Sequence, residues 1–154
     1  MKNKRLYSVL QWTWGLPQTL IGAAVFVIHK KDRHFDYEGA TATGWKRRDG
    51  VSLGKFIFVP EESIPKESVA EKSGSKESVS GKEGGFLLEH EYGHTIQSMI
   101  LGPAYLILVG LPSIIWSRLP YFSKMRKRTG RSYYSAVFER TASELGKKHA
   151  RKAD

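Results

Sequence analysis

The sequence predicts a membrane-associated α+β fold for a chain of 154 residues. An uncharged, apolar run covers Val9–Ile28, which is about the length of a helix that crosses a hydrocarbon core. β-Prone runs separated by turn signals follow between residues 34 and 60. Residues 86–146 then carry a histidine pair at helical spacing, a second apolar segment and a further helical pattern. At this length one domain is expected.

Residues 1–33 are interpreted as an N-terminal membrane anchor, a transmembrane helix. The basic sequence MKNKR precedes the apolar run and His29–Asp32 follows it, as is typical of membrane-flanking charge. Gly15 and Pro17 are expected to kink this helix. A secretory signal peptide is the alternative, but the residues after the run do not form a small-residue cleavage site.

Residues 34–60 are expected to form a short β region outside the lipid. The turn signal Asp49-Gly50 separates β-prone runs, of which Lys55–Val59 is the most apolar. This pattern predicts an antiparallel hairpin or meander. The strand at Lys55–Val59 would offer an edge along which an extended peptide substrate aligns.

Residues 61–85 are predicted to be a flexible charged loop. They are rich in Ser, Lys, Glu and Gly, lack aromatic residues, and repeat Lys-Glu-Ser-Val at Lys66 and Lys76. Such a segment cannot bury enough apolar surface to offset the entropy of ordering. A solvated charged helix is the alternative, which Pro65 and the glycines disfavour.

The sequence His90-Glu91-Tyr92-Gly93-His94 is an HExxH motif within a predicted helix that ends at Gly102-Pro103. Residues four apart share a helix face, so His90 and His94 are predicted metal ligands and Glu91 the general base of a hydrolytic reaction. The chain has no cysteine, so thiolates cannot hold the metal. Chance occurrence in a chain this long is below about one per cent. Two surface histidines are the alternative, which leaves the helix-weakening Gly93 unexplained.

A catalytic zinc ion needs a third protein ligand. No third histidine follows His94 at the metzincin spacing. The motif therefore resembles that of the gluzincins, zincin-like metallopeptidases with a second motif of the type Glu-x-x-x-Asp. Glu139 is the best match, with Ser143 at the aspartate position. Glu144 is the second candidate, and a solvated glutamate is the alternative role for Glu139.

A wider resemblance covers about two thirds of the chain. The passages QWTWGLPQTLIG, Gly-Lys-Phe-Ile-Phe-Val and HEYGHTIQSMILGPAYLILVGLPSIIW resemble small, largely uncharacterised bacterial membrane proteins with an HExxH motif. In that group the late helix reads Thr-Glu-Lys-Trp-Ala-Asp, which matches Phe138–Ser143. The resemblance implies a membrane protein with a metal site and again places the third ligand at Glu139.

The second apolar segment, Ala104–Leu119, is short for a straight span and is interrupted by Gly110 and Pro112. If it crossed the bilayer, the histidine pair and Glu139 would lie on opposite sides. We therefore expect a re-entrant or interfacial segment. The alternative is a site inside the membrane between two spanning helices. A C-terminal helix from Ser132 and a basic tail, residues 147–154, complete the chain.

Together these features predict a zinc-dependent hydrolase of the metallopeptidase type, located in the cell membrane, with lipids and a peptide or protein as partners. The alternative is a non-catalytic membrane scaffold or binding protein with a structural or vestigial metal site. The net charge of +10 suits an anionic membrane surface. Nucleic-acid binding is not expected, because no aromatic residues accompany the basic tail. Tyr133, Tyr134 and His149 are candidate donors to an oxyanion.

Overall fold

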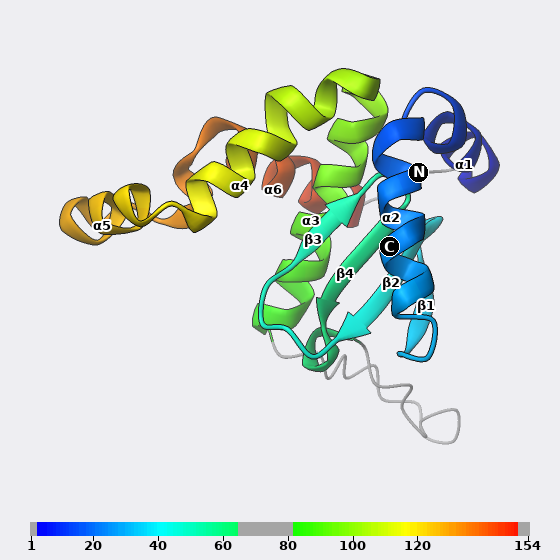
Figure 1. Cartoon of the computed structure of the whole chain (residues 1–154), viewed down its shortest axis with the longest axis horizontal. Helices are drawn as coiled ribbons and strands as arrows, with labels where there is room; N and C mark the ends of the chain where they lie inside the picture. Colours follow the sequence, from blue (N-terminus) through cyan, green and yellow to red (C-terminus); the bar gives the residue numbers. More distant parts are fainter. Residues whose placement is uncertain (1–2, 65–81, 151–154) are drawn as a thin grey trace.

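The computed structural model describes residues 3–64 and 82–150. These residues form a mixed α and β fold, as predicted, in which a four-stranded sheet lies between two helices (Figure 1). Helix α2 (Leu16–Ile28) covers one face of the sheet and helix α3 (Lys82–Leu101) covers the other. Helix α6 (Val137–Ala150) packs on α3, so the HExxH motif lies between the sheet and α6.

The N-terminal apolar run does not form one helix. Helix α1 (Lys4–Thr13) ends at Trp14, and α2 begins at Leu16 with Pro17 in its first turn. The prediction of a single transmembrane helix is therefore wrong, because the glycine and proline that were expected to kink the helix separate two helices instead. Both helices pack against α3 or its end.

Three uncharged polar side chains of this N-terminal pair point inward. Gln11, Gln18 and Thr19 are fully buried, whereas Leu20 and Val27 on α2 are 53 % and 62 % exposed. Gln11 Nε2 donates to the carbonyl of Thr95, and Gln18 Nε2 donates to Ser98 Oγ and to the carbonyl of Gly102. The pair is thus attached to α3 by hydrogen bonds, and several apolar side chains of α2, among them Leu20 and Val27, face outward.

The sheet consists of β1 (His34–Tyr37), β2 (Ala40–Trp45), β3 (Val51–Leu53) and β4 (Phe56–Pro60), in the order β1-β2-β4-β3. The pairs β1–β2 and β3–β4 are antiparallel hairpins, whereas β2 and β4 are parallel. Antiparallel hairpins therefore occur in this region, as predicted, but neither of them spans Asp49-Gly50 and a meander is not formed.

The tight hairpin turns lie at Glu38-Gly39 and Gly54, where φ is positive. The predicted turn at Asp49-Gly50 instead joins β2 to β3, which β4 separates. The expectation that Lys55–Val59 is an edge strand is also wrong, since β4 is an inner strand and the edges are β1 and β3.

Strand β4 is buried along its whole length and divides the core in two. Ile57 and Val59 pack with Tyr92 of α3. Phe56 and Phe58 pack with side chains of α2. The alternation follows from the two-residue period of a strand, and it gives each covering helix its own apolar contact with the sheet.

The charged segment is structured at both ends of its predicted range. Residues Glu61–Ser63 form a short 3-10 helix, η1, with Ser63 and Ile64 buried, and α3 begins at Lys82. The predicted loop at residues 65–81 lies outside the described residues. The predicted end of α3 is confirmed: Gly102 has φ +55 and begins the 3-10 helix η3 (Gly102–Ala104).

The second apolar segment forms a π-helical turn η4 (Leu106–Gly110) and helix α4 (Leu111–Arg118), followed by α5 (Pro120–Thr129). No single helix of the described residues is long and apolar enough to cross a membrane. The segments Gly85–Ala104 and Leu106–Arg118 reach the length and apolar character of a span only when they are taken together, and the chain bends by 119° between them. A short 3-10 turn, η5 (Tyr133–Ser135), leads into α6, and residues 147–149 of the predicted basic tail belong to the last turn of α6.

Candidate metal centre

Two glycines allow α3 and α6 to approach closely. A Cβ atom on Gly93 would lie 1.8 Å from the carbonyl oxygen of Ala142, and one on Gly146 would lie 1.9 Å from that of Glu89. Any side chain at either position would push the helices apart. The glycine inside the HExxH motif thus has a structural role, which brings the histidine face of α3 against Glu139 of α6.

The three predicted ligands come together in this contact. His90, His94 and Glu139 are buried, with exposed fractions of 2 %, 5 % and 0 %. Their candidate ligand atoms all lie within 4.8 Å of one another, and these residues could hold a metal ion. The second candidate ligand, Glu144, is exposed and pairs instead with Arg140 on the surface of α6.

The two distances from the carboxylate to the histidines match the spacing of ligands on a tetrahedral ion. Glu139 Oε2 lies 3.0 Å from His90 Nε2 and 3.3 Å from His94 Nε2. Two ligand atoms at about 2.0–2.1 Å from a tetrahedral zinc ion are separated by about 3.3 Å. Each histidine therefore already presents its Nε2 at ligand spacing from the carboxylate.

The hydrogen-bond network assigns the proton of His90. Ser143 Oγ donates its single hydrogen to the carbonyl of Glu139 and lies 2.8 Å from His90 Nδ1. The serine oxygen must then accept from His90, so Nδ1 carries hydrogen. In the neutral imidazole the lone pair is on Nε2, which faces Glu139.

The same reasoning applies to His94. Gln97 Nε2 donates to Phe138 O and Thr141 Oγ1, which identifies the amide nitrogen. Its oxygen Oε1 lies 2.8 Å from His94 Nδ1 and accepts from it. His94 Nε2 thus also directs a lone pair toward Glu139 when the ring is neutral.

Two neutral imidazoles and a carboxylate would repel one another in this arrangement, so the cluster requires a cation, either bound protons or a metal. Burial opposes a charge on His94, but its hydrogen bond to Glu139 and the nearby carboxylates outweigh burial and raise its pKa. Burial likewise opposes ionisation of Glu139, yet its hydrogen bonds with His90 and His94 hold its pKa far below the usual range. The electrostatics therefore favour an ionised carboxylate beside positive charge.

The other oxygen of Glu139 is held by two hydroxyl groups. Ser113 Oγ of α4 donates to Glu139 Oε1 at 2.5 Å, and Tyr133 Oη of η5 donates to it at 2.8 Å. An ionised carboxylate only accepts hydrogen bonds, so these contacts fix which oxygen turns toward the histidines. Such partners orient ligands and tune metal affinity.

Glu91 lies on the sheet side of α3. Its carboxylate Oε2 is 2.6 Å from Ser52 Oγ of the edge strand β3, and a Cβ atom on Gly50 would lie 2.3 Å from Oε1. Burial raises the pKa of Glu91, against the attraction of His94 and His90. A carboxylate whose affinity for a proton is raised suits the predicted role of general base.

The three candidate oxyanion donors are placed differently. Tyr133 is hydrogen-bonded to Glu139. Tyr134 makes an edge-to-face contact with His90, with ring centroids 4.8 Å apart, and His149 packs against Tyr92 at 6.2 Å. Tyr133 and Tyr134 therefore belong to the surroundings of the metal ligands. His149 lies beside a core aromatic residue.

Sequence reasoning missed the residues that support the ligands, except Ser143, which it noted at the aspartate position. Ser113, Gln97 and Ser52 have no motif of their own. Ser113 and Ser52 come from segments 26 and 39 residues away from their partners. Only the positions of α4 and β3 in the folded protein show that Ser113 lies beside Glu139 and Ser52 beside Glu91.

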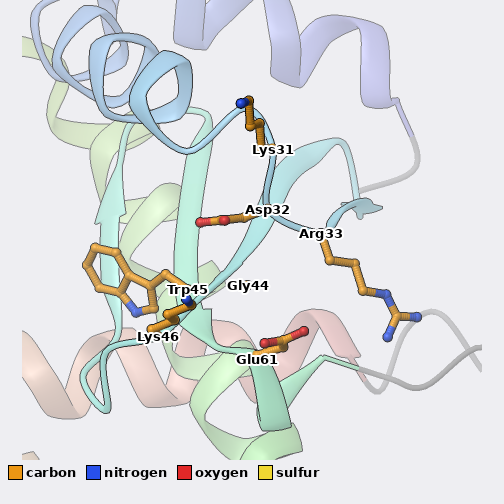
Figure 2. A pocket seen from close by; sticks show the side chains of 7 residues that line it. All are labelled: Lys31, Asp32, Arg33, Gly44, Trp45, Lys46 and Glu61. Carbon is orange, nitrogen blue, oxygen red and sulfur yellow. The ribbon is translucent and has the colours of Figure 1, made fainter.

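A separate pocket of about 440 Å³ lies at the end of β2 and contains none of these residues (Figure 2). Its lining mixes cationic and acidic side chains, and Asp32 is already bonded to His29. The lining residues are Lys31, Asp32, Arg33, Gly44, Trp45, Lys46 and Glu61.

Comparison of the chain with protein-family profiles, with curated proteins and with solved structures finds no match. A hypothesis about function therefore depends on the geometry of the site.

Proposed function

We propose that this protein is a membrane-associated zinc hydrolase of the metallopeptidase type, with His90, His94 and Glu139 as ligands and Glu91 as general base. The observation that carries the proposal is the convergence of two imidazole Nε2 atoms on Glu139 Oε2, each with its Nδ1 hydrogen already donated. Such a donor set suits a divalent cation.

Zinc is the metal that this donor set and its surroundings favour. Two imidazoles and a carboxylate also form the ferrous site of some oxygenases. The adjacent Glu91 supports the zinc assignment, because hydrolysis needs a general base and a carboxylate next to the histidines on the same helix supplies one. A bound zinc ion would supply a Lewis acid for a carbonyl group and for water.

Glu91 would take the proton at its carboxylate and pass it to the leaving group. Ser52 Oγ restrains Oε2 of that carboxylate, and Gly50 leaves room for Oε1. Burial by the sheet raises its proton affinity, which suits a group that accepts a proton from water and then returns it as an acid.

A peptide substrate is supported by the edge strand beside Glu91. Strand β3 pairs only with β4 within the described sheet, so its outer edge offers backbone groups to an extended chain. Ser52 links this strand directly to Glu91. A peptide paired along β3 would therefore pass close to the general base.

Membrane association is supported by the reversed pattern of exposure in α2. A helix on a soluble protein buries its apolar face and exposes its polar face. Helix α2 buries Gln18 and Thr19 and exposes Leu20, Ile21 and Ile28. Large exposed apolar patches mark a membrane or partner surface, while Gln18 Nε2 and Thr19 Oγ1 donate their hydrogen bonds inside the protein.

The alternative is a structural metal in a non-catalytic protein, and the burial of all three ligands favours it. Structural zinc sites are closed, whereas a catalytic site keeps an open position. No ligand is more than 5 % exposed. Activity would therefore need movement of the segments that cover the site.

Metal content of the detergent-purified protein tests the proposal. Zinc and iron per chain are measured for the wild type and for His94→Ala, Glu139→Ala and Glu91→Gln, together with hydrolysis of a mixed peptide library. We expect about one zinc per chain in the wild type, its loss in the two ligand variants, and retained zinc without hydrolysis in Glu91→Gln.

Other outcomes distinguish the catalytic zinc site from a structural metal site, from an iron site and from the absence of a metal site. A wild type that binds no metal would overturn the site. Zinc bound without turnover would support the structural-metal alternative. Iron in place of zinc would preserve the ligands and reject the hydrolase.

A further inference from the structure

Helices α4 and α5 form an arm, defined as residues 111–129, that projects away from the sheet and the paired helices α3 and α6 (Figure 1). The inner side of the arm contacts the metal centre and its support. Ser113 Oγ donates to Glu139, and Trp116 Nε1 donates to the carbonyl of Tyr133. These bonds join the arm to η5 and to the start of α6.

The outer side of the arm is apolar near α3. Leu111, Ile114 and Ile115 lie three and four residues apart and are 53 %, 57 % and 37 % exposed. They continue the exposed residues of η4, Ile107 and Leu108. Residues at this spacing share one face of a helix, so the arm presents a continuous apolar strip that nothing within the described residues covers.

The far half of the arm is cationic. No acidic residue occurs between Glu91 and Glu139, whereas six Lys and Arg residues do. Lys124, Lys127 and Arg128 of α5 are exposed and form no ion pair among the described residues. Clusters of cations beside an apolar helix are typical of binding to anionic lipids.

We propose that the arm docks on an anionic phospholipid surface, with the strip around Ile114 in the acyl boundary and the cations of α5 at lipid phosphates. This inference rests on the proposed membrane association and goes beyond it, since it names the lipid charge and a second contact surface besides α2. A neutral protein partner would match the apolar strip but not the unpaired cations.

Docking would place the metal centre close to the membrane surface. Ile114 faces outward, while Ser113, its neighbour in the chain, holds Glu139. One turn of α4 thus carries both Ile114, which would contact lipid, and Ser113, whose hydroxyl group donates to the proposed ligand Glu139. Substrates bound near the headgroups would therefore reach the centre from the side of the arm.

The absence of cysteine in the chain allows single-cysteine probes. Ile114→Cys reports on the arm, Leu20→Cys on the apolar face of α2, and Lys46→Cys on an exposed control position. Each is labelled with an environment-sensitive fluorophore and reconstituted with phosphatidylcholine vesicles, with or without phosphatidylglycerol. Emission and quenching by spin-labelled lipid measure immersion.

We expect the Ile114→Cys probe to enter the lipid only when phosphatidylglycerol is present and to leave at high salt. Each surface cation contributes about fivefold to membrane affinity. Replacing Lys124, Lys127 and Arg128 by Gln should therefore weaken docking on the order of 100-fold. Replacing Arg140, Lys147 and Lys148 of α6 by Gln is the matched charge control and should leave the signal unchanged.

The probes distinguish failure of docking from failure of the membrane location. If Leu20→Cys is immersed but Ile114→Cys ignores lipid charge and the α5 substitutions, the docking proposal is overturned and the membrane location stands. If neither probe is immersed in either vesicle, both are overturned. Metal content, measured on the same samples, reports on the hydrolase proposal separately.

Discussion

Two hydroxyl groups, of Ser113 and Tyr133, hold the carboxylate of Glu139, the proposed ligand. Glu139 has one oxygen between the two imidazoles and the other on Ser113 and Tyr133. Without these donors the carboxylate would be free to rotate, and the entropy of fixing it would reduce metal affinity. The two hydroxyls are thus positioning groups for the metal ligand.

Removal of one donor tests this role. We expect Ser113→Ala to weaken zinc binding about 10- to 100-fold, as loss of a hydrogen bond to a ligand typically does, with the helical content unchanged. Competition with a zinc chelator measures the affinity. Ser117→Ala is the matched control, because that hydroxyl bonds only to the carbonyl of Ile114 on the exposed side of α4. Equal affinities in the two variants would show that Ser113 has no positioning role.

Gly93 offers a second test at this scale. A methyl group there would meet the carbonyl of Ala142 at 1.8 Å, so Gly93→Ala should force α3 and α6 apart. We expect a loss of about 1–3 kcal/mol in the free energy of unfolding and loss of zinc. Gly110→Ala is the control, since its nearest neighbour would be 3.7 Å away. Retention of zinc by Gly93→Ala would contradict the close helix contact.

The cluster of His90, His94 and Glu139 was predictable from sequence, but the residues that form hydrogen bonds with it were not. The four-residue spacing of His90 and His94 predicts that their side chains lie close together, because a helix places them on one face. Glu139 required the resemblance to a second motif. Ser113 and Ser52 meet their partners only through the tertiary arrangement, so no local pattern distinguishes them from other serines.

At the scale of elements, buried glutamines determine how the N-terminal helices are arranged. The apolar run predicts one long helix because most of its residues are apolar. Gln11 and Gln18 lie on either side of the break at Gly15, and both bond to α3 or to the turn that follows it. Satisfying two buried amides against one partner helix favours two shorter segments over a continuous one.

A substitution at Gln18 tests this attachment. Gln18→Leu would leave the buried carbonyl of Gly102 and the hydroxyl of Ser98 without their donor. We expect a loss of about 1–3 kcal/mol in denaturant unfolding of the detergent-solubilised protein. Leu20→Ala, on the exposed side of the same helix, is the control and should have little effect. If both variants unfold alike, the glutamine bonds do not hold α2 in place.

The strand pairing shows a second limit of sequence reasoning at this scale. The sequence predicts a strand around Phe56 and Phe58 and predicts hairpins in this region. Its insertion between β2 and β3 depends on two helices that bury both of its faces. A five-residue apolar strand is typical of a buried position, so its composition favours an inner strand over an edge strand.

For the whole molecule, the aromatic core beside α3 links segments distant in sequence. Tyr7 of α1 and Tyr37 of β1 both pack against Tyr92, with ring centroids 6.1 Å and 5.4 Å away. The sequence shows aromatic residues in all three segments but not their convergence. This cluster joins the N-terminal helices, the sheet and the motif helix into one cooperative body.

The tyrosines of this core predict loss of stability at alkaline pH. Burial raises the pKa of Tyr7 to about 12 and that of Tyr37 to about 12, from an ordinary value of 10.0. Because the folded protein holds the neutral phenol, the stability is complete below about pH 10 and is lost as the pH rises toward 12. For the fully buried Tyr7 this corresponds to about 3 kcal/mol. Unfolding free energies measured across this range, with tyrosinate absorbance, should decline most steeply in the wild type and less in Tyr7→Phe. A flat profile would mean that water reaches the phenol in the folded state, and the core could not then be the closed junction of α1, β1 and α3.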